Sequence, residues 1–132
     1  MTMTDPIADL LTRIRNAQQA GHPNLQLSTS KEKLAICAIL EKEGYVRGFS
    51  KIEKTPRGLI EIELKYDREG VGAIKGIKRS SKPGRRVYVG SDSIPNVQSG
   101  LGVAILSTSK GVLAGHTARE RKLGGELLCT VW

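Results

Sequence analysis

Apolar residues recur at a helical spacing near the start of the chain. They fall on the i, i+3, i+4 and i+7 positions of one face, occupied by Ile7, Leu10, Leu11 and Ile14. Asp5 or Thr4 stands before Pro6, a residue suited to the first helical position, and Gly21 follows the stripe. The pattern predicts an amphipathic helix that Asp5 or Thr4 caps and Gly21 ends.

A second helical segment follows a short extended stretch at residues 24–27. Thr29 and Glu32 have the spacing of a capping box, in which a hydroxyl and a carboxylate satisfy free amides at a helix start. Residues 34–40 are apolar on almost every side, and Gly44 comes soon after them. We expect a largely buried helix that starts at Thr29 and is closed by Gly44.

Alternating polar and apolar residues predict strands in the middle of the chain. Residues 45–54 and 59–66 form two such runs, and the Thr-Pro-Arg-Gly sequence at 55–58 between them favours a tight turn. The two runs therefore predict a hairpin. A third strand is expected at residues 71–79.

A second group of elements follows the sequence SSKPGRR at residues 80–86, where Pro and Gly among polar residues break the periodicity. We expect a short strand at 87–89, a strand starting at Val103, a short helix opened by a capping pattern at 117–120, and a last strand at 126–132.

These elements predict an α+β protein of two lobes. Residues 1–81 form the N-terminal lobe, with two helices on a small three-stranded sheet. Residues 82–132 form a β-rich C-terminal lobe with one short helix. The length of 132 residues suits one ordinary domain or two small lobes.

The charge is unevenly distributed. The chain carries a net charge of +8, of which residues 1–66 contribute +2 and residues 67–132 contribute +6. Six cations and no carboxylate fall between residues 75 and 91, namely Lys75, Lys78, Arg79, Lys82, Arg85 and Arg86. Such a density predicts either a solvated basic face or a surface matched to a polyanion.

A hydroxyl-rich segment follows the apolar run at residues 103–106. Its members are Ser107, Thr108, Ser109, Lys110 and Gly111. Hydroxyls, free amides and an ammonium suit the phosphates, ribose hydroxyls and base edges of folded RNA. An ordinary turn at a hairpin tip is the alternative, because the same residues favour turns for local reasons.

Three further residues and one aromatic belong to the same candidate surface. Gly124 and Gly125 next to Glu126 allow a ligand to approach the backbone closely, or simply begin a strand after a helix C-cap. Tyr88 offers one stacking surface. With five aromatic residues in the chain, we expect recognition of RNA shape by polar contacts and no broad stacking platform.

Other functions have less support. A hydrolase or transferase using Ser107 or Ser109 lacks an oriented base, since His116 is the sole candidate near them in sequence. A scaffold for acidic proteins or membranes would need a cationic amphipathic helix, which we do not find. Cys37 and Cys129 lack the close spacing of metal or redox motifs and are expected to be buried free thiols. We expect no catalytic residues, metal or cofactor.

The chain resembles the family of ribosomal protein eight of the bacterial small subunit over essentially its whole length. The resemblance is carried by TDPIADLLTRIRNA at residues 4–17, SKPGRRVY at 81–88, STSKG at 107–111, LGGE at 123–126 and CTVW at 129–132. Their order and spacing make the resemblance specific.

The resemblance implies a non-enzymatic constituent of the small ribosomal subunit. It implies direct binding to the central domain of 16S ribosomal RNA, help in assembling the platform, proteins five and twelve as neighbours, and in some members repression of their own operon messenger RNA. The RNA-binding residues expected from the basic segment and the resemblance together are Lys82, Arg85, Arg86, Tyr88, Ser107, Thr108, Ser109, Lys110, Gly111, Gly124, Gly125 and Glu126.

The first residues lack the cationic start of a signal peptide, and no apolar run approaches the ~20 residues of a membrane span. We therefore expect a cytoplasmic protein, in the ribosome.

Overall fold

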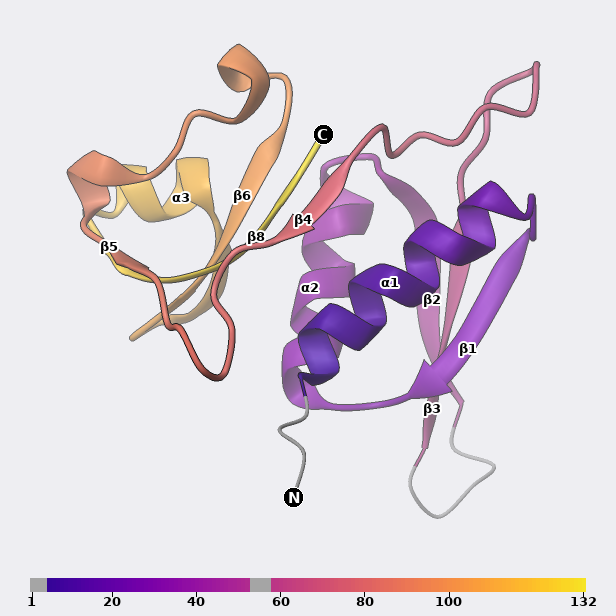
Figure 1. Cartoon of the computed structure of the whole chain (residues 1–132), viewed down its shortest axis with the longest axis horizontal. Coiled ribbons are helices and arrows are strands. Elements are labelled where there is room, and N and C mark those ends of the chain that lie inside the picture. The colour runs from indigo at the N-terminus through magenta and orange to yellow at the C-terminus, as the bar shows by residue number, and fades with distance from the viewer. Residues whose placement is uncertain (1–4, 53–57) are drawn as a thin grey trace. The chain divides into compact units, whose positions relative to one another are not determined.

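A computed structural model describes residues 5–52 and 58–132 (Figure 1). The chain forms two compact units, one made of residues 9–74 and the other of residues 5–8 together with 75–132. Each unit contains an antiparallel sheet. The α+β fold class predicted from the sequence is confirmed.

The unit of residues 9–74 packs helices on one face of a three-stranded sheet with the order β1-β3-β2 (Figure 1). Its elements are α1 (Pro6–Gln19, which starts in the other unit), β1 (Asn24–Ser28), α2 (Lys31–Lys42), β2 (Val46–Ile52) and β3 (Leu59–Leu64). Ile60 and Ile62 of β3 are fully buried, whereas Glu61 and Glu63 face away from the core. One face of the sheet therefore carries the helices.

The start and end of α1 follow the sequence prediction. Asp5 Oδ1 accepts a hydrogen bond from the Ala8 amide at 3.1 Å, and Pro6 is the first helical residue. Gly21 has a φ of +74° just beyond the last turn, a conformation that glycine adopts without a Cβ clash.

The capping prediction for α2 is wrong by one residue. The N-cap is Ser30, whose Oγ accepts from the Lys33 amide at 3.2 Å. The preceding Thr29 turns its hydroxyl inward, where it is buried and has no partner among the described residues. The end of α2 agrees with the prediction, since Gly44 follows it with a φ of +84°.

The predicted hairpin is present, because β2 pairs antiparallel with β3. The predicted turn at 55–58 lies outside the described residues except for Gly58. The third strand is β1, which pairs with β3, and the assignment of residues 71–79 to this sheet is wrong. Glycines at 72 and 76 interrupt that segment, and only its end, β4 (Ile77–Arg79), forms a strand, in the other unit.

The unit of residues 5–8 and 75–132 is built on a five-stranded sheet. Strands β4, β8 (Gly125–Val131), β6 (Val103–Thr108) and β7 (Gly111–Ala114) lie in that order, and β5 (Tyr88–Val89) also pairs with β8. Two short 3-10 segments, η1 (Ser91–Ser93) and η2 (Val97–Gly100), connect β5 to β6. Helix α3 (Gly115–Glu120) packs against β6 over a core formed by Ile94, Ala104, Leu106, Ala118 and Leu127.

The predicted capping pattern at residues 117–120 is wrong. Helix α3 begins at Gly115 with Ala114 as its N-cap, and no side chain caps it. Ala114 is also the last residue of β7, where it pairs with Ile105. The strand register therefore fixes the helix start, and Thr117 lies inside the helix.

Strands β4 and β5 lie along the same edge of β8. Arg79 pairs with Cys129, and the amides of Ser80 and Ser81 continue this pairing to the carbonyls of Leu128 and Leu127, both at 3.0 Å. The chain then leaves the sheet and returns at Tyr88. Residues 77–81, which the sequence assigns to the first lobe, thus pair with the second unit.

Candidate nucleic-acid interface

One row of the five-stranded sheet brings together three of the candidate residues. Tyr88 of β5 pairs with Glu126 of β8, and Glu126 pairs on its other side with Ser107 of β6. The three residues come from segments that are far apart in the sequence. The register of the sheet, and no local motif, places them side by side.

The hydroxyl-rich segment forms the tip of the β6–β7 hairpin. Ser109 and Lys110 make the turn, and both side chains are exposed. Thr108 Oγ1 donates to the Gly111 carbonyl at 2.8 Å and accepts from the Lys110 amide at 3.1 Å. The Thr108 hydroxyl thus closes the turn, while Ser107, half-buried, and Ser109 flank it.

The cationic segment forms a small loop between β4 and β5, which we call the basic loop (residues 82–86). Its base is an antiparallel bridge, in which the Lys82 amide donates to the Arg85 carbonyl at 3.0 Å and the Arg85 amide donates back at 2.9 Å. Pro83 and Gly84 make the turn between them, as their conformational preferences favour. The Lys82 and Arg85 side chains are exposed.

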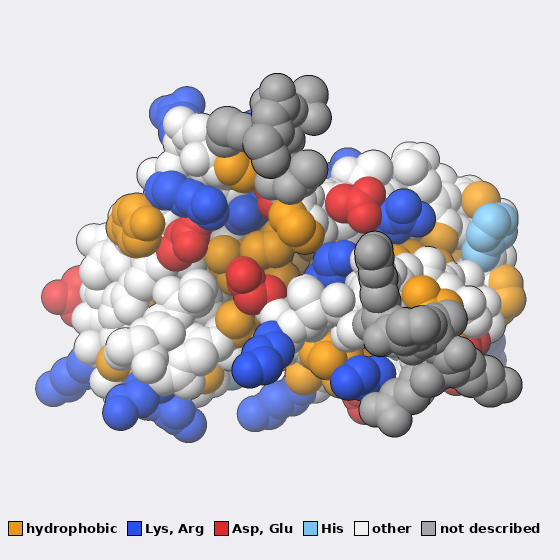
Figure 2. Space-filling model, turned by 90° about the horizontal axis from the view of Figure 1, so that it is seen from below, with side chains coloured by type: hydrophobic (Ala, Val, Ile, Leu, Met, Phe, Trp, Pro, Cys, Tyr) orange, Lys and Arg blue, Asp and Glu red, His pale blue; other side chains and the backbone are white. Residues whose placement is uncertain are grey.

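The basic loop and the β6–β7 tip project from the same end of their unit (Figure 1). Residues 75–132 carry ten Lys or Arg and three Asp or Glu. Viewed from below, several Lys and Arg side chains are visible on this part of the surface, with Asp or Glu side chains among them (Figure 2). Hydroxyls and cations therefore share one end of the sheet.

The six cations of residues 75–91 differ in their environment. The Arg79 side chain is only 8% exposed, with its Nε 3.0 Å from Asp5 Oδ2 and its Nη1 donating to the Leu128 carbonyl at 2.5 Å. This arginine joins the N-cap of α1 to the sheet and is not available to a ligand. All three cations of the basic loop, Lys82, Arg85 and Arg86, are exposed, although Arg86 also pairs with Glu126.

Glu126 binds Ser81, the residue just before the basic loop, and Arg86, the last residue of the loop. Its Oε2 accepts from the Oγ of the fully buried Ser81 at 2.5 Å and from Arg86 Nη1 at 2.9 Å. Ser81 Oγ in turn accepts from the Val87 amide at 3.2 Å. Desolvation by burial raises the pKa of Glu126, but the hydrogen bonds from Ser81 and Arg86 and the charges of Arg86 and Arg79 outweigh it and hold the pKa below its usual value.

The glycines before Glu126 are required by strand packing. A Cβ on Gly125 would lie 2.1 Å from the Ser107 carbonyl oxygen, and one on Gly124 would lie 2.5 Å from the Val89 carbonyl oxygen. They lie at the start of a strand after a helix C-cap, which was the second possibility raised by the sequence, because α3 has Arg121 as its C-cap and β8 begins at Gly125. Their absent side chains let β5 and β6 approach β8 closely.

Tyr88 is the most exposed aromatic side chain for which burial is described, at 70%. It lies on β5, an edge strand, directly beside Glu126. An exposed phenol ring next to hydroxyls and cations provides a face for stacking and an O–H for hydrogen bonding.

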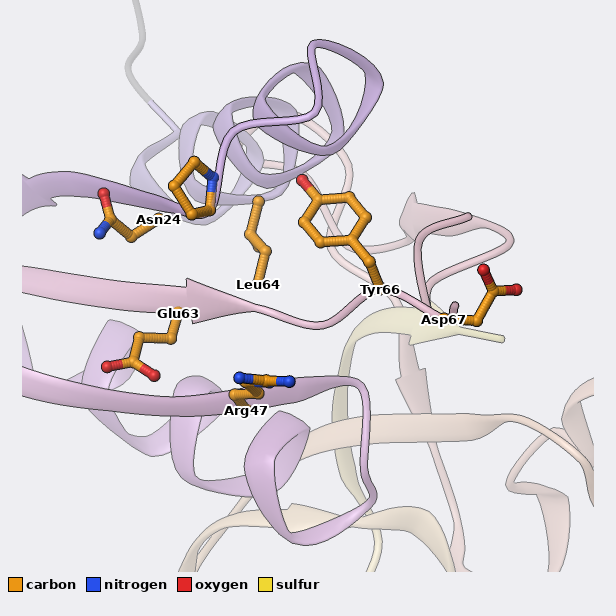
Figure 3. Close-up of a pocket in the computed structure, with 7 residues that line it drawn as sticks. Asn24, Arg47, Glu63, Leu64, Tyr66 and Asp67 are labelled. Carbon is orange, nitrogen blue, oxygen red and sulfur yellow. The ribbon is translucent and has the colours of Figure 1, made fainter. Parts of the chain in front are cut away.

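A pocket in the other unit contains none of the predicted residues. Its volume is about 400 Å³, and its lining residues are Pro23, Asn24, Arg47, Glu63, Leu64, Tyr66 and Asp67 (Figure 3). Side chains of both charges line it, and the Tyr66 hydroxyl donates to the His22 carbonyl at 2.5 Å. It offers neither a paired nucleophile and base nor a uniformly charged surface.

The two thiols lie in the interior of the protein. Cys37 and Cys129 are buried and free, as predicted, and burial raises the pKa of each thiol to about 12. The described part of the chain contains no group of three or more His, Cys, Asp or Glu placed to hold a metal ion. In the same residues, no helix has the length and apolarity needed to cross a membrane.

Comparison with known proteins identifies the family. A sequence model of ribosomal protein S8 matches residues 5–132. The small ribosomal subunit protein uS8 of Nitratidesulfovibrio vulgaris (strain DSM 19637 / Miyazaki F) is 58% identical over 130 residues, which cover 98% of this chain and 99% of that protein. The protein of the same name from Geotalea uraniireducens (strain Rf4) is 52% identical over 132 residues, the whole of both chains.

Members of this family are structural components of the small ribosomal subunit, which lies in the bacterial cytoplasm, and the family is not enzymatic. They associate with ribosomal RNA and with other ribosomal proteins. The full-length match and the identities above 50% leave one assignment: this chain belongs to the ribosomal protein S8 family.

Proposed function

We propose that this chain binds the central domain of 16S ribosomal RNA directly through the end of the sheet described above. The surface consists of the β6–β7 tip at residues 107–111, Tyr88, the basic loop, and the start of β8 with Gly124, Gly125 and Glu126. The observation that carries the proposal is the arrangement of the exposed hydroxyl tip and the exposed cationic loop at one end of the same sheet.

The residues divide into two kinds of contact. Ser107, Ser109 and the amides of the tip suit ribose 2′-hydroxyls and base edges, which distinguish a folded RNA from other polyanions. Lys82, Arg85 and Lys110 suit phosphates, which contribute affinity and little sequence information. Tyr88 supplies one stacking face. The tip thus provides specificity, and the basic loop provides most of the electrostatic affinity.

Binding to a central-domain fragment of 16S RNA and to an unrelated folded RNA of equal length tests this division. Ser109→Ala should weaken cognate binding about tenfold and leave the unrelated RNA almost unchanged, because a neutral hydrogen bond is lost. Lys82→Ala should weaken both RNAs similarly. Ser50→Ala, an exposed serine on β2, is the matched control and should change neither. Equal losses on both RNAs for Ser109→Ala would contradict specific recognition by the tip.

The salt dependence tests the electrostatic part separately. If about six phosphates are neutralised, affinity should fall roughly a thousandfold between 50 and 200 mM monovalent salt. Lys82→Ala with Arg85→Ala should reduce the slope, and Ser109→Ala should not. An affinity independent of salt would rule out phosphate contacts by the basic loop.

The wider role follows from the same surface. We propose that binding helps assemble the platform of the small subunit beside ribosomal proteins five and twelve, and that operon messenger RNA with the same folded shape competes for the surface. Reconstitution of the subunit with Ser109→Ala should slow platform assembly. Failure of the operon leader to displace the 16S fragment would exclude the regulatory part alone.

A further inference from the structure

The basic loop is fastened to the sheet by one carboxylate. Ser81 lies just before the loop, Arg86 is its last residue, and both donate to the same oxygen of Glu126, at 2.5 and 2.9 Å. Ser81 also accepts from the amide of Val87, the residue just after the loop. Glu126 and Ser81 together therefore join the two ends of the loop across β8.

The loop has little else to hold it in the described structure. A single two-residue bridge between Lys82 and Arg85 closes it. A hairpin of this size is marginal in water by itself. Lys82, Arg85 and Arg86 also repel one another, so the loop needs an anchor and a countercharge at its base.

We infer that Glu126 is a positioning residue for RNA binding: its carboxylate acts through Ser81 and Arg86 to hold the basic loop in the arrangement that presents Lys82 and Arg85 to phosphates. This inference rests on the proposed function of the surface. It assigns Glu126 a role different from direct contact with RNA.

The direction in which RNA affinity changes when the Glu126 charge is removed tests the inference. A carboxylate on a surface that binds a polyanion repels it, so removal of the charge alone should tighten RNA binding. A carboxylate that orders the loop has the opposite effect, because its loss adds the cost of ordering the loop upon binding. Ser81 is fully buried, so its substitution affects RNA binding only through the loop.

The first experiment compares Glu126→Gln, Ser81→Ala and the double variant on the cognate 16S fragment and the unrelated RNA. We expect Glu126→Gln to weaken cognate binding about tenfold despite the removal of a negative charge, and Ser81→Ala to weaken it similarly. The double variant should lose no more than the larger single loss, since both changes release the same loop. Glu120→Gln, an exposed acid on α3, is the control and should leave binding equal or slightly tighter.

The second experiment needs no RNA. Amide hydrogen exchange in the free protein should quicken at Arg85 and Val87 in both single variants and remain unchanged at β6 and β8 core amides. Glu126→Asp, which keeps the charge but shortens the side chain, should behave like Glu126→Gln. The core amides show that each variant is folded.

Three results would overturn the inference. They are tighter cognate binding by Glu126→Gln, wild-type affinity of Ser81→Ala beside a weakened Glu126→Gln, and unchanged exchange at Arg85 and Val87. A wild-type protein that fails to prefer the cognate RNA would instead contradict the proposed function, and the exchange experiment would still decide whether the anchor exists.

Discussion

The pentapeptide Leu-Ser-Thr-Ser-Lys occurs twice in this chain, at residues 27–31 and at residues 106–110, with different structures. In both copies the leucine is buried at or near the end of a strand, as Leu27 of β1 and Leu106 of β6. The first copy then enters helix α2, whereas the second turns back as the β6–β7 hairpin. Identical side chains therefore serve different purposes.

The hydroxyls of the first copy serve the fold. Ser30 caps α2, and the Ser28 carbonyl and Oγ accept from Nζ of the buried Lys33 at 3.0 and 3.3 Å. Thr29 is turned inward. In the second copy the Thr108 hydroxyl closes the turn, and Ser109 and Lys110 are left on the surface.

The residues after each copy account for the difference. Glu32, Lys33 and Leu34 continue the first copy with good helix formers, so Ser30 becomes a cap. Gly111 continues the second copy and adopts a φ of +105°, which a side chain would oppose. A hydroxyl-rich peptide is thus available for recognition only where its neighbours do not use it for capping.

The largest expected effect on stability comes from replacing Gly111, which follows the second copy, by glutamate, the residue type that follows the first copy at position 32. Gly111→Glu should lower the free energy of unfolding by about 2 kcal/mol, because a non-glycine residue is strained at this φ. Urea denaturation measures the loss. Gly90→Glu, at a position with open space and a φ of −77°, is the control and should change stability little. Equal stability of both variants would show that the tip does not depend on glycine.

Matched serine substitutions should affect stability in the first copy and RNA affinity in the second. Ser30→Ala should lower the free energy of unfolding by about 1 kcal/mol through loss of the helix cap, with unchanged affinity per folded molecule for the 16S fragment. Ser109→Ala should leave stability almost unchanged and reduce the affinity. Denaturation and binding on the same preparations measure both. A loss of affinity in folded Ser30→Ala would mean that the first copy also contacts RNA.

The central threonines should respond with opposite sign. Thr108→Val should lower the free energy of unfolding by about 1 kcal/mol, because two hydrogen bonds of the turn are lost. Thr29→Val should raise it by up to about 1 kcal/mol, since a buried hydroxyl without a described partner is replaced by a methyl group of similar shape. Destabilisation by Thr29→Val would indicate that its hydroxyl has a partner.

The smallest effect is a pH dependence confined to the surroundings of the second copy. The pKa of Glu126 lies below its ordinary value of 4.5 in the folded protein, so its contribution to stability is present above that pH and is lost as the pH falls through the folded pKa. The stability difference between wild type and Glu126→Gln should therefore shrink from pH 6 to pH 3. The cost of Ser30→Ala is the control, because its hydrogen bond joins a neutral hydroxyl to an amide. A constant difference for Glu126→Gln would contradict the lowered pKa.

Local patterns predicted the elements whose stabilising contacts are near in sequence. The i, i+3, i+4 stripe of α1 with its Asp5 cap, and the glycines after α1 and α2, are all as expected. Among the predictions that failed, the N-cap of α2 missed by one residue, and the others concern elements fixed by pairing in a sheet. Ala114 is the N-cap of α3 because β7, which ends at Ala114, pairs with β6. Strand β4 belongs to the second sheet and not the first because its partner, β8, is about fifty residues further along the chain.

The sequence by itself determined the helices, the hairpin of β2 and β3, the basic second half, the hydroxyl-rich tip and the family. Only the tertiary structure decided that Tyr88, Glu126 and Ser107 share one row, that the Arg79 side chain is buried, and that Glu126 holds the basic loop. The reason is physical. Helix and strand periods depend on neighbouring residues, whereas the register of a sheet and the pairing of a buried charge depend on segments that meet only after folding.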